Sequence, residues 1–143
     1  PTVMTTIVRT IQFSAGHRLR QHEGKCAHVH GHNYTVEFHA TAEQLDSLGR
    51  VMDFSVLRDR LGGWIDQHWD HGFICSKDDR EVLDAMALVS GQKLFVMEVN
   101  PTAENLARYL LDVVGPEQLA GTGVRLVRVV LAETENCRAE VSI

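Results

Sequence analysis

Long apolar runs are missing from this sequence of 143 residues, although 44% of its residues are hydrophobic. A helix needs about 20 consecutive apolar residues to cross a bilayer, and no stretch approaches that length. The N-terminus also lacks the basic and apolar segments of a secretory signal. We therefore expect no membrane partner and place the protein in the cytoplasm.

Basic clusters are absent as well. The 14 Lys and Arg residues are scattered and are outnumbered by 19 Asp and Glu residues, which gives a net charge of −5. Because a nucleic-acid partner requires a basic face that neutralises phosphates, this pattern argues against nucleic-acid binding.

Cysteine is scarce, and linkers, repeats and low-complexity segments are not seen. Cys26, Cys75 and Cys137 are odd in number and form no Cys-x-x-Cys pair, which fits a reducing compartment better than a disulfide framework. The length and apolar content predict a single domain over residues 1–143 that buries a real core.

The chemistry is concentrated between Cys26 and His32, where the chain reads Cys-Ala-His-Val-His-Gly-His. In an extended strand His30 and His32 point to the same face, so one metal ion could bind both. The best third ligand is His17, which closes a strand-like run. Three histidines with one open position are the ligand set of a catalytic zinc.

Alternation supports this grouping. The apolar residues that share the parity of the histidines form the expected buried faces of two strands: Ile7, Ile11, Phe13, Ala15, Tyr34, Val36, Phe38 and Ala40, with Arg9 as an exception. A bulge near Gly16 or Gly31 would undo the argument.

A histidine alone on an apolar face is usually a core residue, but three of shared parity favour a metal site. His28 is the main alternative ligand. We assign no site role to His22, His39 and His68, which are typical of surface or helix positions.

Two strands, 5–15 and 32–42, joined by the loop 18–31, are predicted to pair antiparallel. Asp53 is the expected N-cap of a helix. Within this helix Gly62-Gly63 marks a kink or close packing, and Gly72 is the expected left-handed residue at its end. Asp70-His71 lies at this exit, where a carboxylate can orient an imidazole as a general acid. An Asp-His pair by itself is usually a surface feature.

The second half predicts a short helix over 78–89 and strand-forming residues over 93–99. A long helix then begins at Asn100-Pro101-Thr102, capped by Asn100 or Thr102, and ends at Gly115-Pro116. Strands follow at 124–132, with Glu133 at its end, and at 139–143. This order predicts an α+β domain with two helices on one face of a four-stranded antiparallel sheet.

On these residues the sequence resembles the 6-pyruvoyltetrahydropterin synthase family almost from end to end. The motifs that carry the resemblance are Phe13-Ser14-Ala15-Gly16-His17, Cys26 with His30-Gly31-His32, Met52-Asp53-Phe54, Asp70-His71, Pro101-Thr102-Ala103-Glu104-Asn105-Leu106 and Ala132-Glu133-Thr134. The resemblance implies a tunnelling fold (T-fold), in which subunits join their sheets into a barrel. It also implies a homo-oligomer, a trimer or hexamer, with active sites between subunits.

The resemblance further implies the site residues. The zinc ligands would be His17, His30 and His32, the catalytic residues Cys26 as proton acceptor, Asp70 and His71 as proton relay and Glu133 as pterin anchor, and the further substrate-binding residues Thr102 and Glu104. Arg18, Arg20 and Lys25 flank the loop and are candidates for holding a triphosphate.

The gap between Cys26 and His30 is short, as in the queuosine-pathway branch of the family. It favours a zinc-dependent lyase that converts 7,8-dihydroneopterin triphosphate to 6-carboxy-5,6,7,8-tetrahydropterin, acetaldehyde and triphosphate. The alternatives are a pyruvoyl synthase, which keeps the side chain, and a non-catalytic pterin- or zinc-binding module. The segment from Cys75 to Val99 is longer than in compact members of that branch.

Overall fold

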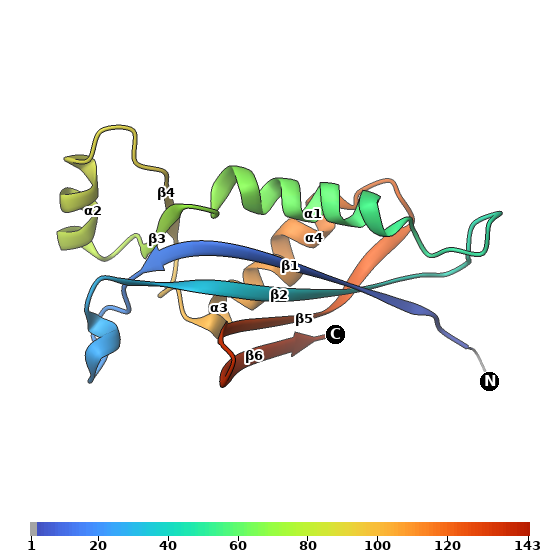
Figure 1. Cartoon of the computed structure of the whole chain (residues 1–143), viewed down its shortest axis with the longest axis horizontal. Helices are drawn as coiled ribbons and strands as arrows, with labels where there is room; N and C mark the ends of the chain where they lie inside the picture. The colour runs from blue at the N-terminus through green and yellow to red at the C-terminus, as the bar shows by residue number, and fades with distance from the viewer. Residues whose placement is uncertain (1–2) are drawn as a thin grey trace.

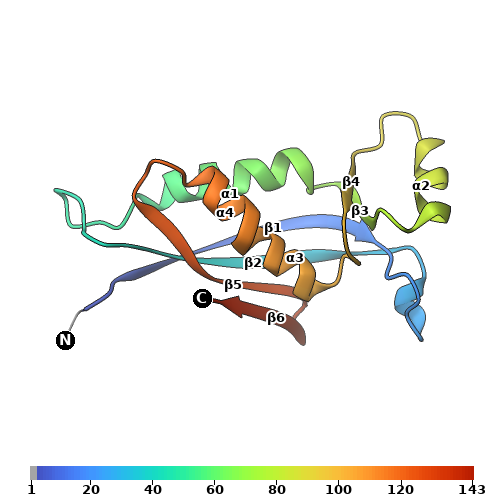
Figure 2. The ribbon, with the colours of Figure 1, turned by 180° about the vertical axis from the view of Figure 1, so that it is seen from behind.

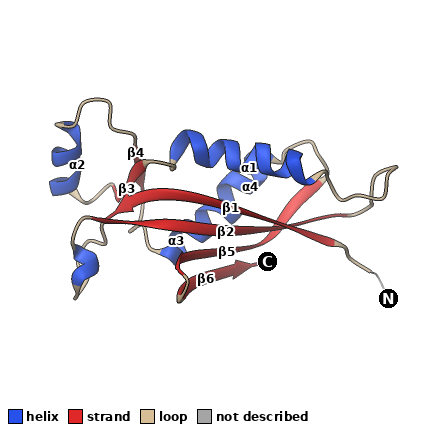
Figure 3. Cartoon of the chain, viewed as in Figure 1, coloured by secondary structure: helices blue, strands red, loops and turns tan. Residues whose placement is uncertain are grey.

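The computed structural model describes residues 3–143 as one sheet with α1 and the segment from α3 to α4 packed on one face, while α2 lies at the end of the sheet against β3 (Figures 1 and 3). The strands are β1 (Thr6–His17), β2 (His30–Ala42), β3 (Gly72–Ser76), β4 (Leu94–Met97), β5 (Val124–Thr134) and β6 (Cys137–Ser142). The helices are η1 (Lys25–Ala27), α1 (Phe54–His68), α2 (Arg80–Ala87), α3 (Ala103–Tyr109), η2 (Leu110–Val114) and α4 (Gly115–Gln118).

The sheet has six strands in the order β4-β3-β1-β2-β5-β6. The antiparallel part, β1-β2-β5-β6, is the sheet that the sequence predicted, but β3 and β4 extend it in parallel with β1. The prediction of a four-stranded antiparallel sheet was therefore wrong. All residues of β3 are buried, so this short strand lacks the alternation that marks a strand in sequence.

The β1–β2 ladder is continuous from the pair Thr6–Thr41 to the pair His17–His30. Gly16 lies opposite Gly31 within this ladder, so neither glycine shifts the register. The predicted faces are therefore confirmed. We call the face under α1 and α3 the covered face and the other the open face.

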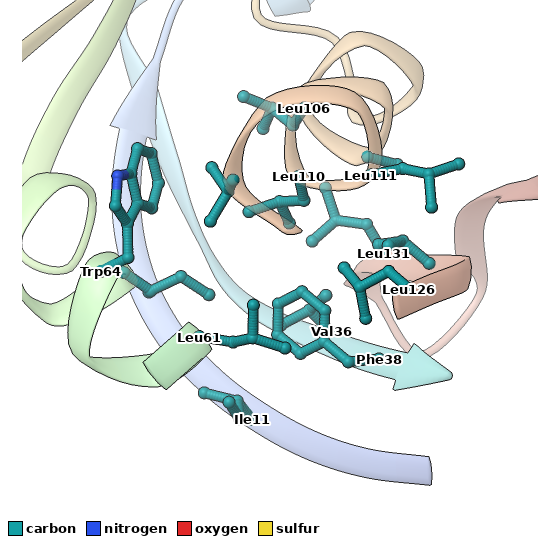
Figure 4. Close-up of a cluster of buried hydrophobic side chains, with 14 of the residues drawn as sticks. Ile11, Val36, Phe38, Leu61, Trp64, Leu106, Leu110, Leu111, Leu126 and Leu131 are labelled. Carbon is teal, nitrogen blue, oxygen red and sulfur yellow. The ribbon is translucent and has the colours of Figure 1, made fainter. Parts of the chain in front are cut away.

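The core lies between the covered face and two helical segments that pack on it, α1 and the segment from α3 to α4. Figure 4 shows Leu61 and Trp64 of α1 and Leu106 of α3 on different sides of strand residues such as Val36, in one buried cluster. Gly62 permits this packing, because a Cβ there would lie 3.1 Å from Cδ1 of Ile11. Of the two roles expected for the glycine pair, close packing holds at Gly62 but not at Gly63, where an added Cβ would meet nothing within 4 Å, and α1 is one continuous helix.

The sequence predicted that the helix beginning near Thr102 ends at Gly115-Pro116, but the helical segment from α3 continues through these residues. The Gly115 N–H donates to the Leu110 carbonyl oxygen, the i to i−5 pattern of a π-helix, and α4 continues to Gln118. Pro116 has no N–H to donate, and the wide turn before it accommodates the proline within a continuing helical segment.

The termini of several strands and helices lie close together at one end of the sheet. In both views β1 ends, β2 begins and α3 begins near the same end of the molecule, with η1 beside them (Figures 1 and 2). Residues from distant parts of the sequence therefore converge there. Within residues 3–143, no helix is long and apolar enough to span a bilayer.

Candidate active site

His17, His30 and His32 form a cluster on the covered face where β1 ends and β2 begins. One nitrogen of each ring lies within 4.8 Å of the corresponding nitrogens of the other two. The ladder explains the arrangement, since His17 pairs directly with His30 and His32 follows on the same face. The three residues are positioned to bind a metal ion. His28, the alternative ligand, is not part of this cluster.

Backbone carbonyls fix the tautomers of two of these rings. His17 Nδ1 donates to the Pro101 oxygen at 2.8 Å, and His30 Nδ1 donates to the His28 oxygen at 2.7 Å. In a neutral ring the other nitrogen is then an unprotonated lone pair. The two Nε2 atoms lie 3.0 Å apart. Two lone pairs at that distance fit a shared cation, and Nδ1-to-carbonyl bonds are the usual support of metal-binding histidines.

His32 adds a buried nitrogen without a partner. Its Nε2 is buried and makes no hydrogen bond within residues 3–143, while Glu133 Oε2 lies 3.8 Å away. Glu133 occupies a β-bulge between the β5–β6 pairs Ala132–Arg138 and Thr134–Cys137. Bulges commonly re-aim a side chain at a site. An orphaned ring nitrogen beside two lone pairs fits a third metal ligand.

His17 is the most enclosed of the three, with 1% of its surface exposed. Burial, opposed by its bond to the Pro101 carbonyl and assisted by the neighbouring imidazoles, lowers the pKa of His17 to about 4. Burial likewise lowers the pKa of His32. Both rings are thus held neutral near pH 7, the form that binds a metal.

A cavity of about 410 Å³ is linked to this cluster by Glu133, which lines the cavity and lies 3.8 Å from His32 Nε2. Four of the residues expected in the site line it together: Cys26, Thr102, Glu104 and Glu133. Thr102 also caps α3, because its side chain accepts from the Asn105 N–H, and Glu104 lies in the first turn of that helix. Cys26 is half-buried in η1, between the two strands that carry the histidines.

Asp70 and His71 lie at the open face instead. They line a cavity of about 500 Å³ with Ser14 and Asn33, and the His71 ring is 82% exposed. Both His71 and His32 line a second cavity on this side of the sheet. Within one chain, neither of these cavities includes Cys26.

The Asp70 carboxylate is well placed to orient His71. His71 Nδ1 donates to Oδ2 at 2.9 Å, and the Ser14 N–H donates to Oδ1 at 2.9 Å. Burial would raise the pKa of Asp70, but these hydrogen bonds and the nearby charge of Lys93 lower it overall. His71 has φ of 60°, so the left-handed residue is His71 and not Gly72 as predicted. Gly72 is tightly packed, since a Cβ there would lie 2.9 Å from Lys93 Cδ.

Of the residues predicted to hold a triphosphate, Arg18 is already paired with acidic side chains. Arg18 pairs with Glu81 at 2.6 Å and Asp79 at 3.5 Å, so its charge is already compensated. Arg138 lines the Cys26 cavity, although no motif in the sequence pointed to it.

Sequence reasoning also missed His22, which lines the Cys26 cavity, and the Pro101 carbonyl. The role of a backbone carbonyl cannot be predicted from the pattern of residue types. His39 pairs with Glu37, and His68 packs on Trp64, in keeping with the absence of a predicted role.

The comparisons define the class of protein. The 6-pyruvoyl tetrahydropterin synthase family model matches residues 6–143, and the chain therefore belongs to that family. The family recognised from the sequence is confirmed. The fold agrees with solved structures: an uncharacterized protein from Wolinella succinogenes matches with a TM-score of 0.80 at 25% identity, covering 99% of each chain. The Caenorhabditis elegans 6-pyruvoyl tetrahydropterin synthase matches with a TM-score of 0.68 at 24% identity, covering 99% of this chain and 96% of that one.

Curated relatives narrow the class further. The Rickettsia felis 6-carboxy-5,6,7,8-tetrahydropterin synthase is 39% identical over 96% of this chain and 100% of its own length. The Aquifex aeolicus protein of the same name is 32% identical over 94% of this chain and 95% of its own. These relatives agree with the branch of the family that the Cys26–His30 gap predicted.

Proposed function

We propose that the protein is a zinc-dependent lyase that converts 7,8-dihydroneopterin triphosphate and water to 6-carboxy-5,6,7,8-tetrahydropterin, acetaldehyde and triphosphate. The observation that carries the proposal is the juxtaposition of a three-histidine cluster with a cavity lined by Cys26, Thr102, Glu104 and Glu133. The names of the full-length relatives support the product.

His17, His30 and His32 would hold the zinc ion. It would supply a Lewis acid that polarises the side-chain oxygens of the substrate. Nitrogen ligands and a three-residue set with an open position favour zinc at a catalytic site. The Pro101 and His28 carbonyls keep two of the rings in the required tautomer.

Cys26 would act as the base that removes a proton from the substrate side chain. Its half-buried position in the shared cavity gives it access to a bound pterin, and a thiolate is favoured next to a cationic centre. Cys75 is unsuited to this role, because burial raises the pKa of its thiol to about 11. Glu133 would anchor the pterin ring, with Thr102 and Glu104 as further contacts.

Asp70 and His71 would relay protons in a site completed by a second copy of the chain. In one chain His71 is exposed on the open face, away from the Cys26 cavity. A neighbouring subunit that presented its own Asp70-His71 to this cavity would complete the set, in keeping with a homotrimer or hexamer that joins sheets into a barrel. Closed oligomers of this kind repeat the same contact in every subunit.

The cellular setting follows from the same chemistry. We place the enzyme in the cytoplasm, in the biosynthesis of queuosine, where the 6-carboxy product is a precursor of the deazaguanine base. The three cysteines, which are all free thiols, support a reducing compartment.

Product analysis tests the proposal. Purified protein is incubated with 7,8-dihydroneopterin triphosphate, and the products are identified by mass spectrometry. We expect 6-carboxy-5,6,7,8-tetrahydropterin with equimolar acetaldehyde and triphosphate. A pyruvoyl product without acetaldehyde would instead identify a pyruvoyl synthase, and bound pterin without triphosphate release would identify a binding module.

A further inference from the structure

Asn100, between β4 and α3, holds the loop that carries Cys26. Its Nδ2 donates to the backbone oxygen of Arg20 at 3.0 Å, and its Oδ1 accepts from the Arg20 N–H at 3.0 Å. One side chain thus satisfies both backbone polar groups of a residue 80 positions away. Such reciprocal bonds fix the position of the held segment and its direction together.

The held segment connects directly to the reactive thiol. The Leu19 N–H donates to the Cys26 carbonyl oxygen at 3.0 Å, which closes the base of the loop over residues 18–29. The other hydrogen bonds inside the loop are local: the N–H groups of His22, Ala27 and His28 donate to the oxygens of Leu19, Gly24 and Lys25, and the Gly24 N–H donates to His22 Nδ1. None of these bonds ties the loop to α3. Asn100 therefore positions Cys26 through Arg20 and Leu19.

The backbone of Asn100 is held independently of its side chain. Its carbonyl oxygen accepts from the Thr102 N–H at 2.9 Å and from Asn105 Nδ2 at 2.9 Å. The next carbonyl, that of Pro101, orients His17. A change confined to the Asn100 side chain should thus free the loop and leave the turn, the metal cluster and the α3 cap in place.

We propose that Asn100 is a positioning residue that docks the Cys26 loop against the start of α3, so that the thiol faces the cavity with Thr102 and Glu133. The proposal rests on the proposed function only in giving Cys26 a role in turnover. The docking itself is a physical property of the chain, measurable without substrate.

The test compares Asn100→Ala with a matched control, Thr122→Ala. The Thr122 hydroxyl likewise donates to one backbone group, the Leu119 oxygen, and accepts from another, the Val124 N–H, but it lies in the turn between α4 and β5. The readouts are the alkylation rate of Cys26 with iodoacetamide, resolved by peptide mass spectrometry, the bound zinc, and kcat and KM.

We expect Asn100→Ala to raise the alkylation rate of half-buried Cys26 by at least about fivefold, since each lost hydrogen bond shifts a two-state equilibrium by roughly that factor. The kcat should fall by about 10- to 100-fold through misplacement of the base, with KM and zinc content unchanged. Thr122→Ala should change neither alkylation nor kcat.

Wild-type alkylation and kcat in folded Asn100→Ala would overturn the proposal, as would a lower melting temperature alone. If Asn100→Ala does not fold, Asn100→Asp keeps the acceptor for the Arg20 N–H and loses the donor, and it should give an intermediate alkylation rate; a wild-type rate there would also overturn the proposal. Because alkylation needs no turnover, a failure of the proposed lyase activity would be seen separately.

Discussion

The covered and open faces of the sheet differ at the end where β1 ends and β2 begins. On the covered face the histidine cluster contains one buried and two half-buried residues, and two of its rings are fixed by backbone carbonyls. On the open face Asp70 is hydrogen-bonded to β1, but His71 extends its ring into solvent. One chain therefore contains three histidines positioned to bind a metal ion and, separately, an exposed Asp70–His71 pair. Under the proposed function, the metal centre would depend on folding alone, whereas the relay would depend on assembly.

Removing the metal ligands should have the largest effect. In the double variant His30→Ala/His32→Ala we expect zinc to be lost and turnover to fall by about 10⁴-fold or more, because both the Lewis acid and the substrate template disappear. Metal content and initial rates measure this. His28→Ala is the matched control and should keep both, since His30 contacts only the backbone oxygen of His28. Full zinc occupancy in the double variant would exclude the cluster as the site.

Replacing the thiol should separate chemistry from metal binding. Cys26→Ala should keep zinc and fold and lose about 10³-fold in kcat, the contribution of a general base. Cys75→Ala is the control and should retain turnover, because Cys75 is buried away from the cavity. A Cys26→Ala variant that turns over near the wild-type rate would show that another group is the base.

A smaller effect is expected on the open face. Asp70→Asn keeps an oxygen to accept from the Ser14 N–H but removes the carboxylate charge beside His71 Nδ1. The kcat should fall by about 10²-fold. The melting temperature should change little, which circular dichroism can check. Unchanged kcat would remove Asp70 from the relay.

His17, on the covered face, should make the stability of the folded chain sensitive to acid. For metal-free protein, the His17 pKa of about 4 against 6.5 in the unfolded chain means that the unfolded state binds more protons as pH falls below 6.5. Stability should be full above pH 6.5 and fall by roughly 3 kcal/mol as the pH approaches 4. Urea unfolding between pH 4 and 7.5 measures this loss. His17→Gln should flatten the profile, and an equally steep profile in that variant would assign the loss elsewhere.

The sequence predicted the covered face better than the open one, for physical reasons. Strict alternation in β1 and β2 places His17, His30 and His32 on one face, because the period of a strand allows no other arrangement without a bulge. The strand β3 escaped prediction because it is buried on both sides and short. Relations that depend on backbone atoms, such as the Pro101 carbonyl on His17, leave no sequence pattern.

The separation of Cys26 from His71 could not be predicted from their positions in the chain. Both lie in turns next to β1, yet the cavities they line belong to different faces of the sheet. The resemblance to a family with sites between subunits gave the only signal, and the exposed His71 ring is the structural observation that agrees with it.

Mixing two inactive variants tests the central claim, that the metal face and the relay face work together across copies of the chain. Cys26→Ala and His71→Asn are suitable, since asparagine tolerates the left-handed backbone found at position 71. The two variants are unfolded and refolded together in equal amounts, and each is also refolded alone. If every site combines Cys26 of one subunit with His71 of another, roughly a quarter of the sites in a random mixture carry both native residues. We predict that the mixture recovers about that fraction of wild-type turnover. Mixed oligomers that remain as inactive as either variant alone would contradict the account.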